Sequence, residues 1–349
     1  MSPPQTDSSP TTQGRWLHGL KRVLLAMGVG LFSLLVLGAV YEAVSGARDE
    51  SRFPAPGTRV EVGGHFLHLN CMGEGRPIVV LEAGAGGMST AWAWVQPEVA
   101  KVTRVCAYDR AGHGWSDTWE GPADAENAVK QLHAALAGAG EIGPLVLVGH
   151  SLGGLFVRAY ADRYPDEVAG LVLLDSSHPD QMERLPQAMR EQFELGKKVL
   201  ALAPALARVG VLRATGLFAL QARGLPEQAY AQSASFMCTP KYLKATHDEM
   251  AAWESSAAQV RAMEDLGDLP LMVVSAGTAP AGAPEFVPAF QVLHQELAAL
   301  SSRGEHHLIP EADHMSLLAN EQHALKTSAA ILRLVEKVQA PRVSLPSVP

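Results

Sequence analysis

The sequence lacks the features by which proteins usually bind nucleic acids or metal ions. Lys and Arg number 28 against 36 Asp and Glu, the net charge is −8, and no basic run offers a patch for phosphates. The three cysteines, Cys71, Cys106 and Cys238, are too few for a disulfide scaffold and form no CxxC pair. His306 and His307 are neighbours, but adjacent residues of a strand point to opposite faces. We expect no nucleic-acid partner, no metal and no cofactor.

What is present indicates a globular protein. The 349 residues are 47% hydrophobic and 18% charged, a composition that supports a sizeable core rather than a disordered chain. This length suits one large domain with an insertion, or two ordinary domains.

An uncharged apolar run covers residues 23–41. As a helix rising about 1.5 Å per residue, it nearly matches the hydrocarbon thickness of a bilayer. It follows residues 1–22, a tail rich in Pro, Ser and Thr that ends in a basic cluster. We favour an uncleaved signal anchor. A cleaved signal peptide, with Ser45-Gly46-Ala47 as the site, and a buried core helix are the alternatives.

The charges around this run predict its orientation. Positively charged residues precede the run, and the residues that follow it carry no net positive charge. This bias places the N-terminus in the cytoplasm and the chain after residue 42 on the far side of the membrane. Residues 42–57 then form a tether. The protein is expected at the membrane, or secreted if the segment is cleaved.

From residue 58 onward, short apolar runs alternate with helical stretches. Continuous apolar strands are typical of a parallel sheet covered by helices on both faces. Helices are expected near 92–100, 124–139 and 152–164, a helical cap insertion at about 176–267, and a loose tail at 339–349. The expected strands are 58–62 and 66–71 as a hairpin, then 78–82, 104–108, 145–148, 171–174, 271–275 and 307–310.

The strongest local signal is Gly149-His150-Ser151-Leu152-Gly153, directly after an apolar strand and before a helical stretch. Glycines on both sides of a serine permit a tight strand-to-helix turn that holds the hydroxyl clear of the backbone. The N-terminal end of the helix also favours developing negative charge.

Three further segments accompany this motif, two before it in the chain and one after it. They are 79–87 (VVLEAGAGG), 108–116 (YDRAGHGWS) and 312–318 (ADHMSLL). With them, residues 58–338 resemble the α/β-hydrolase superfamily of serine hydrolases, esterase- or lipase-like members with a helical cap. The resemblance implies a mostly parallel eight-stranded sheet flanked by helices.

The resemblance also assigns roles to residues. It implies Ser151 as nucleophile, His314 as general base, and the backbone N–H groups of Ala85 and Leu152 as the oxyanion hole. In the loop that carries Ala85, the usual His-Gly is replaced by Ala83-Gly84, which leaves the backbone role intact.

The acid of the triad has two candidates. Asp175 ends the strand at 171–174, and Glu285 is the first carboxylate after the strand at 271–275. Both preserve the chain order serine, acid, histidine, and we favour Asp175. In the 108–116 loop, Asp109 and Arg110 are expected to form a structural ion pair. His113 and His150 are interpreted as structural.

These residues predict hydrolysis of a carboxylic ester through an acyl-enzyme. The apolar cap residues Leu202, Leu206, Phe218 and Met237 suggest a small-molecule ester with an apolar part. An aminopeptidase of the proline-iminopeptidase type is the enzymatic alternative, and a non-catalytic membrane-tethered binding protein is the other. Epoxide hydrolases and haloalkane dehalogenases of this fold use an aspartate where Ser151 stands.

The family's strand order makes Cys71 and Cys106 cross-strand neighbours. On the far side of the membrane they could form a disulfide, whereas two buried thiols are the alternative. Cys238 is then left free in the cap.

Overall fold

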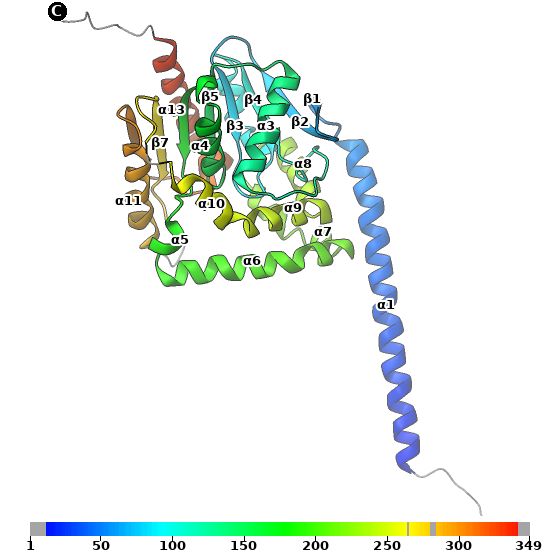
Figure 1. The fold of residues 1–349 in the computed structure, drawn as a ribbon. Coiled ribbons are helices and arrows are strands. Elements are labelled where there is room, and N and C mark those ends of the chain that lie inside the picture. Colours follow the sequence, from blue (N-terminus) through cyan, green and yellow to red (C-terminus); the bar gives the residue numbers. More distant parts are fainter. Residues whose placement is uncertain (1–11, 264, 280–283, 341–349) are drawn as a thin grey trace, which may run out of the picture.

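The computed structural model describes residues 12–263, 265–279 and 284–340 (Figure 1). A single eight-stranded sheet has the order β1-β2-β4-β3-β5-β6-β7-β8. β1 and β2 pair antiparallel, β2 is antiparallel to β4, and all later pairings are parallel. The strands are β1 (Thr58–Val62), β2 (His65–Met72), β3 (Ile78–Glu82), β4 (Val105–Asp109), β5 (Leu145–His150), β6 (Val168–Leu174), β7 (Leu271–Ala276) and β8 (Gly304–Ile309).

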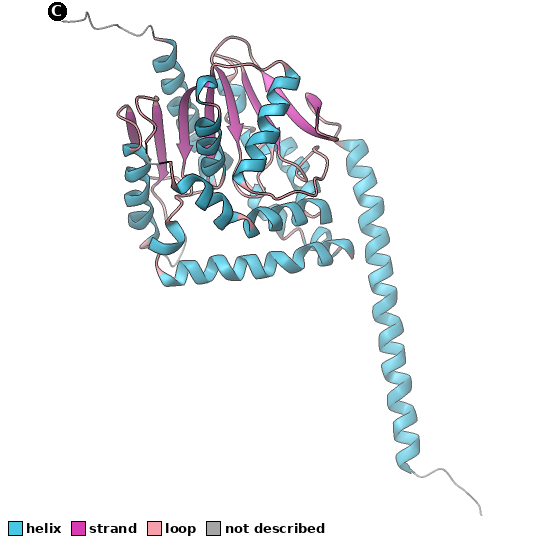
Figure 2. Ribbon diagram, viewed as in Figure 1, coloured by secondary structure: helices cyan, strands magenta, loops and turns pink. Residues whose placement is uncertain are grey.

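Helices cover both faces of this sheet (Figure 2). Alternate strand residues point to opposite sides, so Val80 and Leu147 join one apolar cluster while Val79 and Val146 join the other. The first cluster includes residues of α3 (Ala125–Ala139), α4 (Gly153–Arg163), α10 (Trp253–Arg261) and α11 (Phe286–Ala299). The second includes η1 (Ser89–Trp92), α2 (Gln96–Val99), α12 (Ser316–Ala319) and α13 (Glu321–Gln339). The expected α/β-hydrolase architecture is confirmed.

The helical insertion lies between β6 and β7. It crosses the carboxyl ends of the strands, with one long helix, α6, farthest from the sheet (Figure 1). Its last helix, α10, instead packs beside α3 and α4, because Trp253, Ala257 and Val260 form an apolar stripe one and two turns apart. The remaining helices are η2 (Pro165–Glu167), α5 (Gln181–Arg184), α6 (Gln187–Arg208), α7 (Val211–Thr215), η3 (Phe218–Ala222), α8 (Glu227–Met237) and α9 (Pro240–Ala251).

The N-terminal helix α1 (Thr12–Arg52) projects away from the body of the protein (Figure 1). It contains an 18-residue window of mean hydropathy 2.5, none of which is buried in the structure. Its length corrects the sequence interpretation, because residues 12–22 and most of the expected tether at 42–57 are helical. The tether lacks a proline before Pro54, so nothing interrupts the helix until Arg52. Residues 1–11 and most of the tail at 339–349 lie outside the described residues.

A disulfide joins the two strands at Cys71 and Cys106. The two residues face each other in the antiparallel pairing of β2 with β4, as the family's strand order implied. Cys238 is free and buried in the cap.

Candidate active site

Ser151 stands at a sharp turn between β5 and α4. Its φ of 55° lies in the left-handed region, which a serine adopts only when its surroundings impose it. The flanking glycines are required by space, because a Cβ at Gly149 would lie 2.5 Å from the Gly153 carbonyl oxygen. One at Gly153 would lie 2.6 Å from the carbonyl oxygens of Glu82 and Ala83. This is the local geometry that the serine motif predicted.

Asp175 and His314 meet beside this turn. His314 Nδ1 donates to Asp175 Oδ2 at 2.6 Å, and the Ala276 amide donates to Asp175 Oδ1 at 2.9 Å. Asp175 also has a positive φ, 40°, immediately after β6. Burial alone would raise the pKa of this carboxyl, but the hydrogen bond and charge of His314 lower it to about 2. Asp175 is therefore ionised at neutral pH.

One cavity of about 440 Å³ brings the sequence-derived candidates together. Ser151, His314, Asp175, Ala85 and Leu152 all line it. Within the described part of the chain, the amides of Ala85 and Leu152 donate no hydrogen bond to another protein group.

The alternative acid lies elsewhere. Glu285 sits at the N-terminal end of α11 and is not among the described residues that line the cavity. The structure thus places one of the two candidate carboxylates, Asp175, against the His314 ring.

The glycine-rich loop that carries Ala85 is held by charged groups. Arg110 donates to the carbonyl oxygens of Ala83 at 2.8 Å and Gly84 at 2.6 Å, and Glu249 accepts from the Gly86 amide at 3.0 Å. Arg110 Nε also donates to Glu249 Oε1 at 2.6 Å, so the two side chains that hold the loop also form one buried ion pair.

The expected ion pair between Asp109 and Arg110 is wrong. Asp109 instead accepts from the His68 ring at 2.8 Å and from the Ser89 amide at 2.6 Å, whereas Arg110 pairs with Glu82 and Glu249. Asp109 is the last residue of β4 and Arg110 follows it, so their side chains leave the chain on opposite sides.

His113 and His150 are both buried, as structural residues would be. His113 Nε2 contacts the Thr246 hydroxyl at 3.2 Å, and His150 Nε2 donates to the His314 carbonyl oxygen at 3.0 Å. Burial, with a smaller contribution from the nearby His314, lowers the pKa of His150 to about 3. A neutral His150 therefore fixes the backbone of the His314 loop.

The structure adds supporting residues that the sequence did not reveal. Glu249 lies in the cap, 163 residues from the amide it binds. His294, fully buried, lies 3.9 Å from Asp175 Oδ1, and its Nε2 donates to the Ser176 carbonyl oxygen at 3.0 Å. No local sequence pattern marks these contacts.

The rest of the cavity wall is largely apolar, with Phe193, Met250, Trp253, Phe286 and Phe290 prominent. Of the four cap residues expected to suggest substrate lining, only Met237 lines it. Leu202 and Leu206 are exposed on the outer side of α6, so their assignment is corrected. Phe218 packs within the cap's own apolar cluster.

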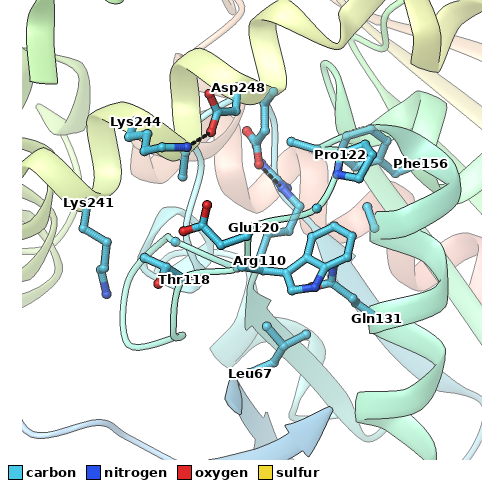
Figure 3. A pocket seen from close by; sticks show the side chains of 18 of the residues that line it. Leu67, Arg110, Thr118, Glu120, Pro122, Gln131, Phe156, Lys241, Lys244 and Asp248 are labelled. Atoms are coloured by element: carbon cyan, nitrogen blue, oxygen red, sulfur yellow. Dashed lines mark hydrogen bonds and ion pairs between the residues drawn. The ribbon is translucent and has the colours of Figure 1, made fainter. Parts of the chain in front are cut away.

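A second cavity, of about 90 Å³, lies between the loop after β4 and helix α9 (Figure 3). Lys244 bonds to Asp248 at its edge, and Arg110 and Lys241 also reach it. The described residues that line it include no serine, cysteine or histidine. It therefore offers no nucleophile and base of the kind found at the larger cavity.

The sheet order, the strained serine turn and the cavity at the carboxyl ends of the strands define an α/β hydrolase. The chain belongs to the alpha/beta hydrolase fold family, whose model matches residues 77–320.

Individual relatives match only parts of the chain. An uncharacterized protein of Bacillus subtilis, YbdG, is 26% identical over 168 residues, which is 46% of this chain and 52% of that protein. A 2-hydroxymuconate semialdehyde hydrolase of a Pseudomonas species is 40% identical over 135 residues, 36% of this chain and 44% of that protein. The chain thus spans about half the length of these curated relatives. An esterase from Thermogutta terrifontis superposes with a TM-score of 0.60 at 22% identity, over 81% of this chain and 99% of that one.

Proposed function

We propose that the protein hydrolyses carboxylic esters with Ser151 as nucleophile, His314 as general base and Asp175 as the acid that orients His314. The observation that carries the proposal is the hydrogen bond of 2.6 Å between Asp175 and His314 at the cavity that also holds Ser151. The esterase and hydrolase relatives are consistent with this chemistry.

The chemistry follows from the roles of these groups. His314 takes the proton of Ser151 as the hydroxyl attacks the carbonyl carbon, and the ionised Asp175 stabilises the resulting imidazolium. The amides of Ala85 and Leu152 bind the tetrahedral oxyanion, and one such donor is worth about 3–4 kcal/mol of barrier. His314 then protonates the leaving alcohol, and a water activated by His314 releases the acyl group.

The cavity favours an ester over a peptide with a free amino terminus. An aminopeptidase needs a carboxylate to bind the substrate's ammonium group. Among the described residues lining the cavity, Asp175 is the sole carboxylate, and it is engaged with His314. The aromatic lining instead suits an ester with an apolar acyl or alcohol part.

We also propose that α1 anchors the protein in a membrane with the catalytic domain on the extracytoplasmic side. The exposed apolar helix and the disulfide between Cys71 and Cys106 support this placement, because disulfides persist in oxidising compartments. Protease protection in intact cells tests it: added protease should reach the catalytic domain without lysis.

Labelling with a fluorophosphonate probe tests the catalytic assignment. Wild type should be labelled and should cleave p-nitrophenyl esters faster than the matching anilides. Ser151→Ala should lose both labelling and hydrolysis with an unchanged midpoint of thermal unfolding, because losing the hydroxyl creates no large cavity.

Ser177→Ala is the matched control, since Ser177 also lines the cavity. It should keep both labelling and turnover. Labelling that survives in Ser151→Ala would assign the nucleophile elsewhere, and an unlabelled wild type would favour a non-catalytic binding protein.

A further inference from the structure

The long cap helix α6 exposes an apolar stripe to the outside of the protein. Leu195, Val199, Leu202 and Leu206 follow one another at intervals of four, three and four residues, which places them on one side of the helix. Their exposed fractions run from 44% to 66%. The inner side of the same helix already buries Met189, Ala203 and Ala207. Packing among the described residues therefore leaves the outer stripe without a partner.

The position of α6 relative to α1 suggests what covers this stripe. In Figure 1, α6 runs across the direction of α1, and the two helices meet near the end of the apolar part of α1. The contact is close: a Cβ at Gly38 would lie 2.1 Å from the carbonyl oxygen of Val209, just after α6. A Cβ at Gly210 would lie 2.7 Å from the carbonyl oxygen of Gly38. Only glycines allow this approach.

Ion pairs also join α1 to the cap near this contact. Arg213 of α7 donates to Glu42 at 2.7 Å and also pairs with Asp49, and both carboxylates belong to α1. Glu42 is the first charged residue after Arg22. It therefore marks where the apolar segment ends and where the surface of a bilayer around α1 would lie. The cap is held at that level.

We infer that α6 lies flat in the membrane interface, with its apolar stripe buried among the acyl chains of the lipids. The inference rests on the proposed anchoring by α1. A helix that runs across a membrane-spanning helix lies along the bilayer plane, and an apolar stripe on an otherwise polar outer face is typical of interfacial helices. By helical spacing, Glu191 and Lys198 border the stripe on one side, so the residues beside it there are charged and suit the polar side of an interface.

This placement concerns the substrate as well. Phe193, on the inner side of α6, lines the catalytic cavity, so α6 separates that cavity from the bilayer. An ester dissolved in the membrane then reaches the cavity along α6 without crossing bulk water. The substrate class that this geometry favours is a membrane-partitioned ester.

Fluorescence quenching in the full-length protein tests the inference. Leu202→Cys carries a bimane label, and the protein is reconstituted into phosphatidylcholine vesicles with or without brominated acyl chains. Ile142→Cys is the matched control, since both side chains are 66% exposed and Ile142 lies in the loop before β5, at the opposite end of the strands. Cys71 and Cys106 are bridged and Cys238 is buried, so the new thiol is labelled selectively.

Brominated lipid should quench the label at 202 and leave the label at 142 bright. Leu31→Cys, in the apolar part of α1, reports on the anchor itself. Quenching at 31 without quenching at 202 would overturn the inference while leaving the anchor intact. No quenching at 31 would refute the anchor and, with it, the inference. Emission at 202 could instead change with the number of protein molecules per vesicle and not with bromine. The stripe would then contact a second copy of the chain, and the inference would also be overturned.

Kinetics supply a second readout. The double variant Leu195→Glu and Leu202→Glu should raise KM for an ester carried in vesicles and leave kcat and KM for a soluble short-chain ester unchanged. An equal effect on both substrates would refute the role of α6 in substrate access. A loss of both activities, together with a loss of Ser151 labelling, would show that the outer face of α6 supports the catalytic site itself, and it would refute a role limited to substrate access.

Discussion

The carboxylate of Glu249 ties the cap to the glycine-rich loop that carries Ala85, the proposed oxyanion loop, and Glu249→Gln tests that connection. Glu249 is buried, accepts two hydrogen bonds from Arg110 and accepts one from the Gly86 amide. Burial alone would raise its pKa, but the charge of Arg110 keeps the pKa below its ordinary value, so the group is ionised. Glutamine keeps the shape and removes the charge.

The expected cost follows from these contacts. A hydrogen bond to a charged group contributes about 1.5–3 kcal/mol, and breaking a buried ion pair costs about 3–5 kcal/mol. Glu82 still pairs with Arg110 in the variant, which keeps the loss near the lower figures. We expect the free energy of unfolding to fall by about 3 kcal/mol. A loosened oxyanion loop should lower kcat about tenfold, less than the 100-fold or more that follows loss of a donor.

Asp248→Asn is the matched control, one residue away. Asp248 pairs with Lys244 at the surface, so its loss should cost less than about 1 kcal/mol and leave kcat unchanged. Urea unfolding in detergent and ester kinetics measure both quantities. Equal, small effects of the two substitutions would refute the idea that the cap holds the oxyanion loop through Glu249.

Three other perturbations probe the site and its frame. Asp175→Asn should lower kcat about 10,000-fold with little change in KM, because His314 loses its orienting charge; a change below tenfold would contradict the triad. Reducing the bridge between Cys71 and Cys106 should raise the reactive thiols of the denatured chain from one to three and cost about 4 kcal/mol for a 35-residue loop. The buried, neutral His150 has its pKa lowered to about 3, whereas the unfolded chain takes up its proton below about 6.5. The free energy of unfolding should therefore fall by about 1.4 kcal/mol for each unit by which the pH is lowered between about 6.5 and 3. His150→Asn should remove that contribution in denaturant titrations at several pH values.

The strands and the serine turn could be predicted from the sequence because their signals are local. Apolar runs placed each strand within three residues of its observed bounds, and Gly149 and Gly153 marked a turn where a Cβ does not fit. The helix at 125–139 was equally clear, since Asp124 caps it and Gly140 ends it in a left-handed conformation.

Contacts between distant segments could not be predicted in this way. Arg110 stands next to Asp109, which made a pair between them the simplest interpretation, yet its partner Glu249 is 139 residues away. The sequence showed the apolar positions of α6, but helical periodicity does not say which apolar stripe faces the cavity when a helix has two. In the structure, Leu202 faces outward and Phe193 lines the cavity.

The part of α1 past residue 42 also contacts a distant partner, Arg213, and Arg213→Ala tests whether this contact supports the helix there. Arg213 pairs with Glu42 and Asp49, so its loss leaves two carboxylates without their cation at the junction of α1 and the cap. Hydrogen exchange in the full-length protein should become faster in α7 and around residues 42–52, while β5 and β6 keep their protection. Arg223→Ala, at an exposed position of the same cap, should leave the exchange pattern unchanged. Faster exchange throughout the sheet would mean that Arg213 supports the whole fold, and unchanged exchange in α7 would mean that the close contact of Gly38 with Val209 suffices to hold the cap on α1.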